Sequence, residues 1–394
     1  MTLAGIWKLD LPVPFEWISQ VYPIYSVVVH IVYASLPLLL TMNFPYLLEN
    51  DPIEVPLLMT LNIPYLLQNN PSEAPETLSK TLYCILLLVK LFSYQSENSK
   101  FLLTEAIVEE AQLYQYADSF TKVIYEKHVL FCNRLNRFIL ISVALSGALL
   151  WEIGIVDSYK FHKLLKNESQ ALVKPLPLKC WYPFDENKYH VWVLIEQLLT
   201  LVWFAISIVS VHTFINSVLI YTRGQLKILQ NYFSNFHRNI FDGGSNGSLA
   251  ALKLLCGKHQ YLIAYLNIAN QTLKTVVFLE YGISSIMLAT ALLQVIAGKN
   301  VITNVVHVSV IISQLLLLAW SSDEIVTQSL QLAPALYQSK WYECDRESRI
   351  LIRIMLMRCQ KPLSIDIGSF GPMTVRSAMS RLKLAYSYTS VMTN

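Results

Sequence analysis

Three residues near the end of the chain have a spacing that would suit an ion path. Tyr388, Val391 and Asn394 recur at i, i+3 and i+6, so a helix would present all three on one face. A ring of valines can close a pore by excluding water, and the Asn394 amide offers neutral dipoles suited to unselective cations. Taken alone, the spacing is better explained by a helix that packs Val391 against its neighbours. The pore interpretation therefore needs further support.

A second group of residues has the spacing of a small-molecule pocket. Ala144, Gly147 and Trp151 occur at i, i+3 and i+7, which is one stripe of a helix. Two small residues leave a hollow and the indole closes its end, as a site for an apolar ligand requires. Ordinary packing of helices through small residues, with a Trp at the membrane interface, explains the same stripe. Both interpretations stay open on the residues alone.

Several motifs of the common enzyme and metal sites do not occur in the sequence. It contains no HExxH or P-loop motif, no paired midplane carboxylates and no inverted repeat. The six cysteines are scattered without a CxxC pair, which argues against a zinc site or a disulfide framework. A formal net charge of +3 indicates no nucleic-acid partner. We therefore expect neither an enzyme nor a bound metal or cofactor.

The composition indicates a membrane protein. Hydrophobic residues make up 54% of the chain and charged residues only 14%, and the mean hydropathy is +0.42. Soluble domains carry about 25% charged residues, so this chain has too few to cover a surface that faces water. Several runs without Asp, Glu, Lys or Arg reach the ~20 residues that a helix needs to cross a bilayer. The uncharged runs are 17–48, 138–151, 197–222, 281–298 and 300–322, of which 138–151 is the shortest, with 14 residues.

The elements that must position these residues are seven membrane-spanning helices. The second span is weak because it carries Lys80 and Lys90, which lie about 15 Å apart along a helix and are expected to snorkel to opposite interfaces. The last span contains Arg376, Arg381 and Lys383, so hydropathy alone would not identify it. The predicted spans are 22–48, 77–96, 136–157, 190–221, 275–298, 301–324 and 371–394.

The segments between the spans predict a helical layer outside the membrane. Residues 97–135, 222–274 and 325–370 are long, charged and helix-like, so we expect them to extend the spans and pack together on one side. The Gly- and Ser-rich segment 241–248 predicts a flexible loop. A tandem near-duplication, 38–56 and 57–75, most simply lengthens the first loop.

The orientation in the membrane does not follow from charge. Lys and Arg have nearly equal densities in the segments on the two sides, so the positive-inside rule does not decide it. Asn167 begins a glycosylation sequon in the 158–189 loop, which suits an outer location. We expect an inner N-terminus, an inner 222–274 segment and an outer 158–189 loop.

The last seventy residues carry a resemblance to a known family. Ala335, Tyr337 and Trp341-Tyr342 form an A-x-Y-x-x-x-W-Y segment, and residues 358–363 form an R-x-Q-K-P-L segment. Near its end the chain reads Ser387-Tyr388-Thr389-Ser390-Val391-Met392. This order resembles the C-terminal signature of the insect odorant receptors. The strong matching covers roughly 325–394, and the rest agrees in span count, loop lengths and size.

Two departures refine the resemblance. The related gustatory receptors end in a T/S-Y-five-apolar-Q-F pattern, whereas Asn394 stands here in the Gln position, which favours an odorant receptor. The family's co-receptor is markedly longer in its second inner loop, so this chain of 394 residues resembles a ligand-tuned subunit. A gustatory receptor channel is the nearest alternative. A G-protein-coupled receptor is the next, although the chain lacks an NPxxY motif in the last span.

The resemblance implies an all-α, ligand-gated, non-selective cation channel in the plasma membrane of an olfactory neuron dendrite. Four subunits, including the co-receptor, would surround one pore lined by the final helix, with the N-terminus in the cytoplasm. That placement favours the pore interpretation of Tyr388, Val391 and Asn394. It divides the chain into a six-helix membrane domain, cytoplasmic anchor helices and the pore helix, at 1–324, 325–370 and 371–394.

The same resemblance places the odorant pocket and the subunit contacts. A small volatile apolar ligand would bind in the outer half of the second, third, fourth and sixth spans, surrounded by lipid. Tyr83, Gln197 and Val306 are expected to join the stripe of Ala144, Gly147 and Trp151 there. The anchor helices would make most subunit contacts, with the predicted contact residues Tyr337, Trp341, Tyr342 and Pro362.

Overall fold

The computed structural model describes residues 82–165 with short gaps before 96, and then 188–236, 244–298 and 300–393. The predicted first span, the tandem duplication, Asn167 and Asn394 lie outside these residues. Among the described residues between 82 and 94 the backbone is helical, in agreement with the second predicted span. The only paired extended residues in the described part are Asp366 and Pro372, in an isolated bridge.

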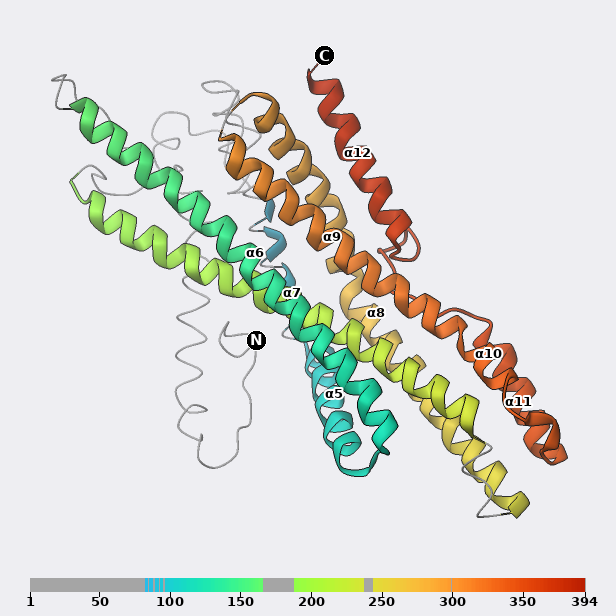
Figure 1. The fold of residues 1–394 in the computed structure, drawn as a ribbon. Coiled ribbons are helices and arrows are strands. Elements are labelled where there is room, and N and C mark those ends of the chain that lie inside the picture. Colours follow the sequence, from blue (N-terminus) through green and yellow to red (C-terminus); the bar gives the residue numbers. More distant parts are fainter. Residues whose placement is uncertain are drawn as a thin grey trace, which may run out of the picture.

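Four long helices dominate the structure (Figure 1). They are α6 (Ser119–Leu165), α7 (His190–Asn235), α8 (Gly244–Ile296) and α9 (Val301–Leu330). At 1.5 Å per residue the 47 residues of α6 extend about 70 Å, far more than the ~30 Å hydrocarbon core. The spans therefore continue beyond the membrane, as the charged segments predict. Within the described residues these are the helices long and apolar enough to cross a bilayer.

The helices begin at polar residues that satisfy their free amides. Helix α5 (Glu97–Tyr116) starts after Ser96, whose side chain accepts a hydrogen bond from the Ser99 amide at 3.3 Å. Asp118 precedes α6 and accepts from both the amide and the hydroxyl of Thr121. These bonds replace intrahelical partners that the first turn lacks. At the other end of the bundle, Gly298 and Asn300 with positive φ allow the tight turn between α8 and α9.

The last part of the chain forms a compact helical layer. It contains α10 (Leu332–Tyr337), the short η4 (Trp341–Glu343) and α11 (Arg346–Cys359), and α12 (Val375–Thr393) follows it. Helix α10 packs on α7 and α11 packs on α8, so this layer closes one end of the bundle, here called the anchor end (Figure 1). A continuous buried core joins it to α5, α7, α8 and α9. The C-terminus of α12 lies near the opposite end.

A bent connection between α11 and α12 is fixed by one side chain of α8. The Asn270 amide donates to the Ser364 carbonyl at 2.7 Å, and its oxygen accepts from the Asp366 amide at 2.9 Å. Gly368 has φ +58° and an added Cβ would lie 3.2 Å from Phe278, so the chain needs glycine there. The connection therefore fixes where α12 begins relative to α8.

The surface of the bundle is apolar where lipid would contact it. On α6 the side chains of Phe138 and Leu145 are exposed, and on α7 those of Trp192 and Leu199 are exposed as well. Such a surface would be unstable in water but is suited to a bilayer. Helix α8, by contrast, lies centrally and contacts α5, α7, α9, α11 and α12.

Two local predictions are wrong. Lys90 does not snorkel to an interface: its side chain is 2% exposed and forms an ion pair with Glu280 of α8. A buried partner removes the reason for the ammonium to reach water. The Gly- and Ser-rich segment 241–248 is not entirely a loop, because α8 already begins at Gly244. The long helix that follows propagates into residues of low intrinsic helix propensity.

Candidate functional site

A cavity of about 240 Å³ lies between the helices, away from the anchor end. Its walls come from the 82–94 segment and from α6, α7, α8 and α9. The volume suits a molecule smaller than typical drug-sized ligands. The lining residues include Tyr83, Leu86, Val143, Gly147, Phe204, Glu280, Ser284, Met287, Ala291, Gln294, Thr303, Asn304, His307, Ile311 and Gln314.

Helix α8 supplies one complete wall. Glu280, Ser284, Met287, Ala291 and Gln294 line the cavity at i, i+4, i+7, i+11 and i+14, which is one face of a helix. This wall is mixed in character, with an acid, a hydroxyl and an amide spaced by apolar residues. Sequence reasoning placed the pocket on four spans and missed this fifth one. The signal was present, because polar residues recurring at helical spacing inside a span indicate a face that avoids lipid.

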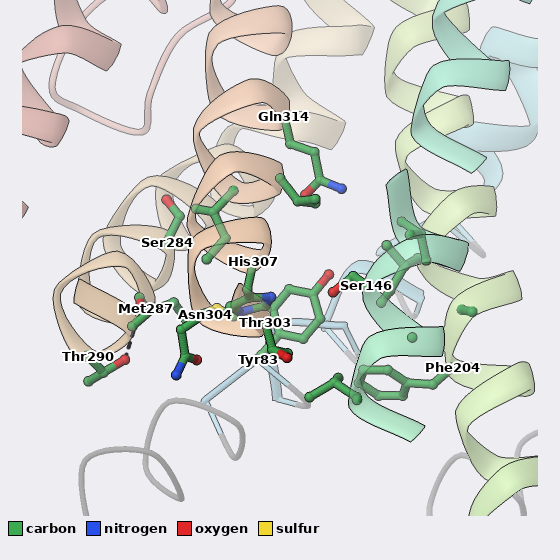
Figure 2. A pocket seen from close by; sticks show the side chains of 18 of the residues that line it. Tyr83, Ser146, Phe204, Ser284, Met287, Thr290, Thr303, Asn304, His307 and Gln314 are labelled. Atoms are coloured by element: carbon green, nitrogen blue, oxygen red, sulfur yellow. Dashed lines mark hydrogen bonds between the residues drawn. The ribbon is translucent and has the colours of Figure 1, made fainter. Parts of the chain in front are cut away.

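The polar groups gather at the two ends of the cavity. Thr303, Asn304 and His307 of α9 lie together with Tyr83 at the end near the α8–α9 turn (Figure 2). Ser284 and Gln314 lie toward the other end, nearer the anchor layer. Between them the walls are apolar and aromatic. A small molecule with an apolar body and a polar end fits such an arrangement.

Close packing of aromatic and small residues shapes the walls of the cavity. The rings of Tyr83 and Phe204 meet edge to face with centroids 5.9 Å apart. Gly147 of α6 lines the cavity, and a Cβ added to it would be 3.9 Å from the Leu201 side chain, an ordinary contact. The missing side chain at Gly147 therefore leaves space that belongs to the cavity.

A buried ion pair forms the floor at the anchor end. Glu280 is the lining residue of α8 nearest that end, and its carboxylate pairs with the Lys90 ammonium. The His212 side chain is buried and interacts electrostatically with both groups. Each charge would be costly alone in this setting, so the pair joins the 82–94 segment to α8.

The cavity wall also touches α12. Leu86, Met287 and Ile311 line the cavity and belong to the same buried cluster as Ala385 of α12. Next to the cavity floor, the Tyr281 hydroxyl interacts with Ser377 of α12. A molecule that displaces these wall residues therefore acts on a buried cluster that includes a residue of α12.

The structure places the six predicted pocket residues in two groups. Tyr83 and Gly147 line the cavity, whereas Ala144, Trp151, Gln197 and Val306 are not among the lining residues. On α6 the lining stripe includes Val143 and Gly147, so the predicted stripe is rotated around the helix, and Ala144 is exposed. The small side chain of Ala144 was the reason for predicting a ligand-sized hollow beside it. Which face of α6 points toward the cavity depends on the packing of neighbouring helices, and the composition of the helix does not determine that packing.

The predicted residues of α9 and α7, Val306 and Gln197, do not line the cavity. Asn304 and His307 line the cavity rather than Val306. Gln197 is buried among the helices, 1% exposed, without reaching the cavity.

The predicted pore and contact residues lie mostly on free surfaces. Tyr388 is 58% exposed and Val391 is 76% exposed, on one face of α12. In the anchor layer Tyr337, Tyr342 and Pro362 are exposed and Trp341 is half-buried. Whether these residues line a pore or contact other subunits stays a prediction. Among the described residues, no group of three or more His, Cys, Asp or Glu is arranged to hold a metal ion.

Comparison with known proteins identifies the family. A family model described as the 7tm odorant receptor family matches residues 70–386, most of the chain. The chain belongs to the insect odorant receptor family. Odorant receptor 10 of Aedes albopictus is 26% identical over 55% of this chain and 59% of the relative. Odorant receptor Or2 of Anopheles gambiae is 28% identical over 37% of this chain and 40% of the relative. These matches thus span about half the length of each relative.

Solved odorant receptor structures share the fold. The olfactory receptor OR5 of Machilis hrabei in complex with eugenol superposes with a TM-score of 0.71, at 16% identity, over 99% of this chain and 94% of that receptor. A second structure of the same receptor gives a TM-score of 0.70. The predicted family and the all-α membrane fold are thereby confirmed, and the family is one of receptors rather than enzymes. The number of spans and the side of the N-terminus stay predictions.

Proposed function

We propose that this odorant receptor is a ligand-tuned subunit of a non-selective cation channel. A small volatile molecule binds in the cavity and opens a central pore lined by α12, in a heterotetramer with the co-receptor. The observation that carries the proposal is the cavity wall shared with α12, in which Met287 and Ile311 line the cavity and pack in one cluster with Ala385. The eugenol complex of Machilis hrabei OR5 supports small-molecule binding by this fold.

The energetics are adequate for gating. Burying about 200 Å² of apolar ligand surface contributes about 5 kcal/mol before the costs of binding are subtracted. Only the difference in affinity between the closed and open channel drives opening. A 100-fold preference for the open state contributes about 2.7 kcal/mol, enough to make the open state as populated as a closed state that was favoured by that amount.

Unburied surfaces support assembly with other subunits. Tyr388 and Val391 are large, exposed side chains on α12, and Tyr337 and Tyr342 are exposed aromatic side chains on the anchor layer. Aromatic residues are enriched in protein interfaces. Four subunits would bury the anchor surfaces and bring α12 helices around one axis. The complex would reside in the plasma membrane of the sensory dendrite, with its N-terminus in the cytoplasm.

The deciding experiment is whole-cell recording with and without the co-receptor across a panel of volatiles that includes eugenol. We expect inward cation currents that need both chains and that stop when ligand is removed. Ala291→Trp, which fills the cavity from α8, should abolish the response at unchanged surface expression. Ile286→Trp on the exposed side of the same helix is the matched control. Currents that survive Ala291→Trp, or that depend on added G protein, would contradict the proposal.

A further inference from the structure

The floor of the cavity presents a carboxylate but hides its counter-ion. Glu280 lines the cavity and keeps 11% of its side-chain surface accessible, whereas the paired Lys90 keeps 2%. The ammonium is therefore closed off behind the acid. A ligand that reaches this end meets the Glu280 side chain before the Lys90 ammonium.

An ionised carboxylate can only accept hydrogen bonds, and it has about four lone-pair positions. The Lys90 ammonium uses part of that capacity. The remaining positions on the accessible side of Glu280 favour a ligand that donates a hydrogen bond. A ligand with only acceptor groups, such as an ether, would desolvate the Glu280 carboxylate without donating a hydrogen bond to it, which costs free energy.

The charges around the floor select against ionised ligands. Lys90 already neutralises Glu280, and His212 lies beside both groups. The Tyr94 hydroxyl is the further titratable group that interacts with Glu280 from the 82–94 segment. An ammonium ligand would meet a second cation in a poorly solvated place, and a carboxylate ligand would meet Glu280 itself. A neutral donor avoids both costs.

We propose that this cavity selects neutral ligands with a hydroxyl donor at one end of an apolar body, the class of small alcohols and phenols. The hydroxyl binds the Glu280 carboxylate at the floor. The apolar body contacts the lining side chains of Leu86, Phe204 and Met287. Gln314, at the same end of the cavity as Ser284, is placed to bind the hydroxyl oxygen (Figure 2). This inference rests on the proposed function, because it assumes that the cavity is the odorant site.

The test compares heptan-1-ol with its isomer 1-methoxyhexane and with heptan-1-amine. In channels with the co-receptor, we expect the alcohol to activate at a concentration at least tenfold below the other two. Glu280→Gln should reduce the difference between the activating concentrations of the ether and the alcohol to threefold or less. The reason is that the glutamine amide can donate a hydrogen bond to the ether oxygen as well. Glu152→Gln, an exposed carboxylate on α6, is the matched control and should leave that difference unchanged.

A second variant and a second measurement guard against misfolding. Glu280→Gln leaves Lys90 buried without its counter-ion, so the double variant Lys90→Met, Glu280→Gln is compared with it; its difference between the two activating concentrations should be equally small. Thermal stabilisation of the purified protein in nanodiscs measures binding without current. Equal stabilisation by alcohol and ether, or no stabilisation by either, would overturn the inference. So would an unchanged difference between the activating concentrations of ether and alcohol in both Glu280→Gln and the double variant. Alcohol-selective stabilisation without any current would instead contradict the proposed channel function.

Discussion

Gly147 contributes space to the cavity because it has no side chain. An alanine there would make an ordinary contact with Leu201, but a larger side chain must enter the cavity. We predict that Gly147→Leu raises the half-maximal ligand concentration at least tenfold, since the added atoms occupy the volume that the ligand fills. The measurement is a dose–response curve at matched surface expression.

Ala144 on the same helix is the control for Gly147. It is exposed and not among the cavity residues, so Ala144→Leu should change the half-maximal concentration less than threefold. Both changes add a good helix former, so a general effect on α6 would appear in both. Equal shifts in the two variants would exclude Gly147 from the ligand site.

His259 makes the stability of the anchor end depend on pH. It is 3% exposed, the Phe233 ring meets it edge to face, and Cys359 Sγ lies 4.0 Å from its Nδ1. Burial, and then the Arg358 charge, lower its pKa from 6.5 to about 4. Below pH 6.5, His259 therefore binds a proton in the unfolded chain but stays neutral in the folded chain. The free energy of unfolding falls as a result when pH falls from about 6.5 toward 4.

We predict a lower melting temperature for the purified protein at pH 5 than at pH 7. His259→Gln should reduce that difference, because the amide does not titrate in this range. The measurement is thermal unfolding of the detergent-solubilised protein at both pH values. An unchanged pH difference in His259→Gln would assign the acid sensitivity to other groups.

At the scale of elements, the Asn270 clamp sets the position of α12. Its amide bonds Ser364 and Asp366 in the connection that precedes α12. We predict that Asn270→Ala lowers the free energy of unfolding by about 1–3 kcal/mol, because two backbone groups lose their partners. It should also raise ligand-free current, since α12 is held less firmly.

Asn267 provides the comparison for this clamp. It is exposed one turn away on α8, so Asn267→Ala should change neither the melting temperature nor the ligand-free current. Asn270→Asp keeps the acceptor for the Asp366 amide and loses the donor to Ser364, so its effect should be intermediate. If Asn270→Ala and Asn267→Ala behaved alike, the connection would be held by other contacts.

The elements were more predictable than the directions of their faces. Hydropathy and charge placed α7 and α9 well, because long uncharged runs have few alternatives to a membrane helix. The same reasoning treated Lys90 as a residue that weakens the second span, because its neutralising partner Glu280 lies far along the chain. The stripe on α6 contained Gly147 but also the exposed Ala144, because the rotation of a helix depends on tertiary packing. The α8 wall was missed for the same reason.

At the scale of the whole molecule, the exposed face of α12 is where we propose that the pore lies. Val391 is 76% exposed, whereas Ala385 and Thr389 are buried against the rest of the chain. We predict that Val391→Glu raises ligand-free current or changes the permeability ratio of monovalent to divalent cations, because a charge wets an apolar constriction. The ranking of ligands should persist, since the cavity lies on other helices.

Dilution by co-receptor subunits would weaken this effect, so the control carries matched substitutions in all subunits. Patch-clamp recordings in mixed cation solutions measure both the leak and the permeability ratio. Unchanged values in the fully substituted channel would place Val391 outside the ion path.

The ion pair beneath the cavity also has a consequence for the making of the protein. A lysine near the middle of a helix costs about 2.5–3.5 kcal/mol during insertion by the translocon. The ribosome produces Lys90 long before Glu280, so the nascent 82–94 segment must enter the bilayer without its counter-ion or wait at the translocon until α8 arrives. We expect a nascent chain truncated before Glu280 to leave this segment accessible to aqueous thiol reagents at introduced cysteines, and a chain extended beyond α8 to protect it. Equal accessibility in both chains would mean that the segment inserts unaided.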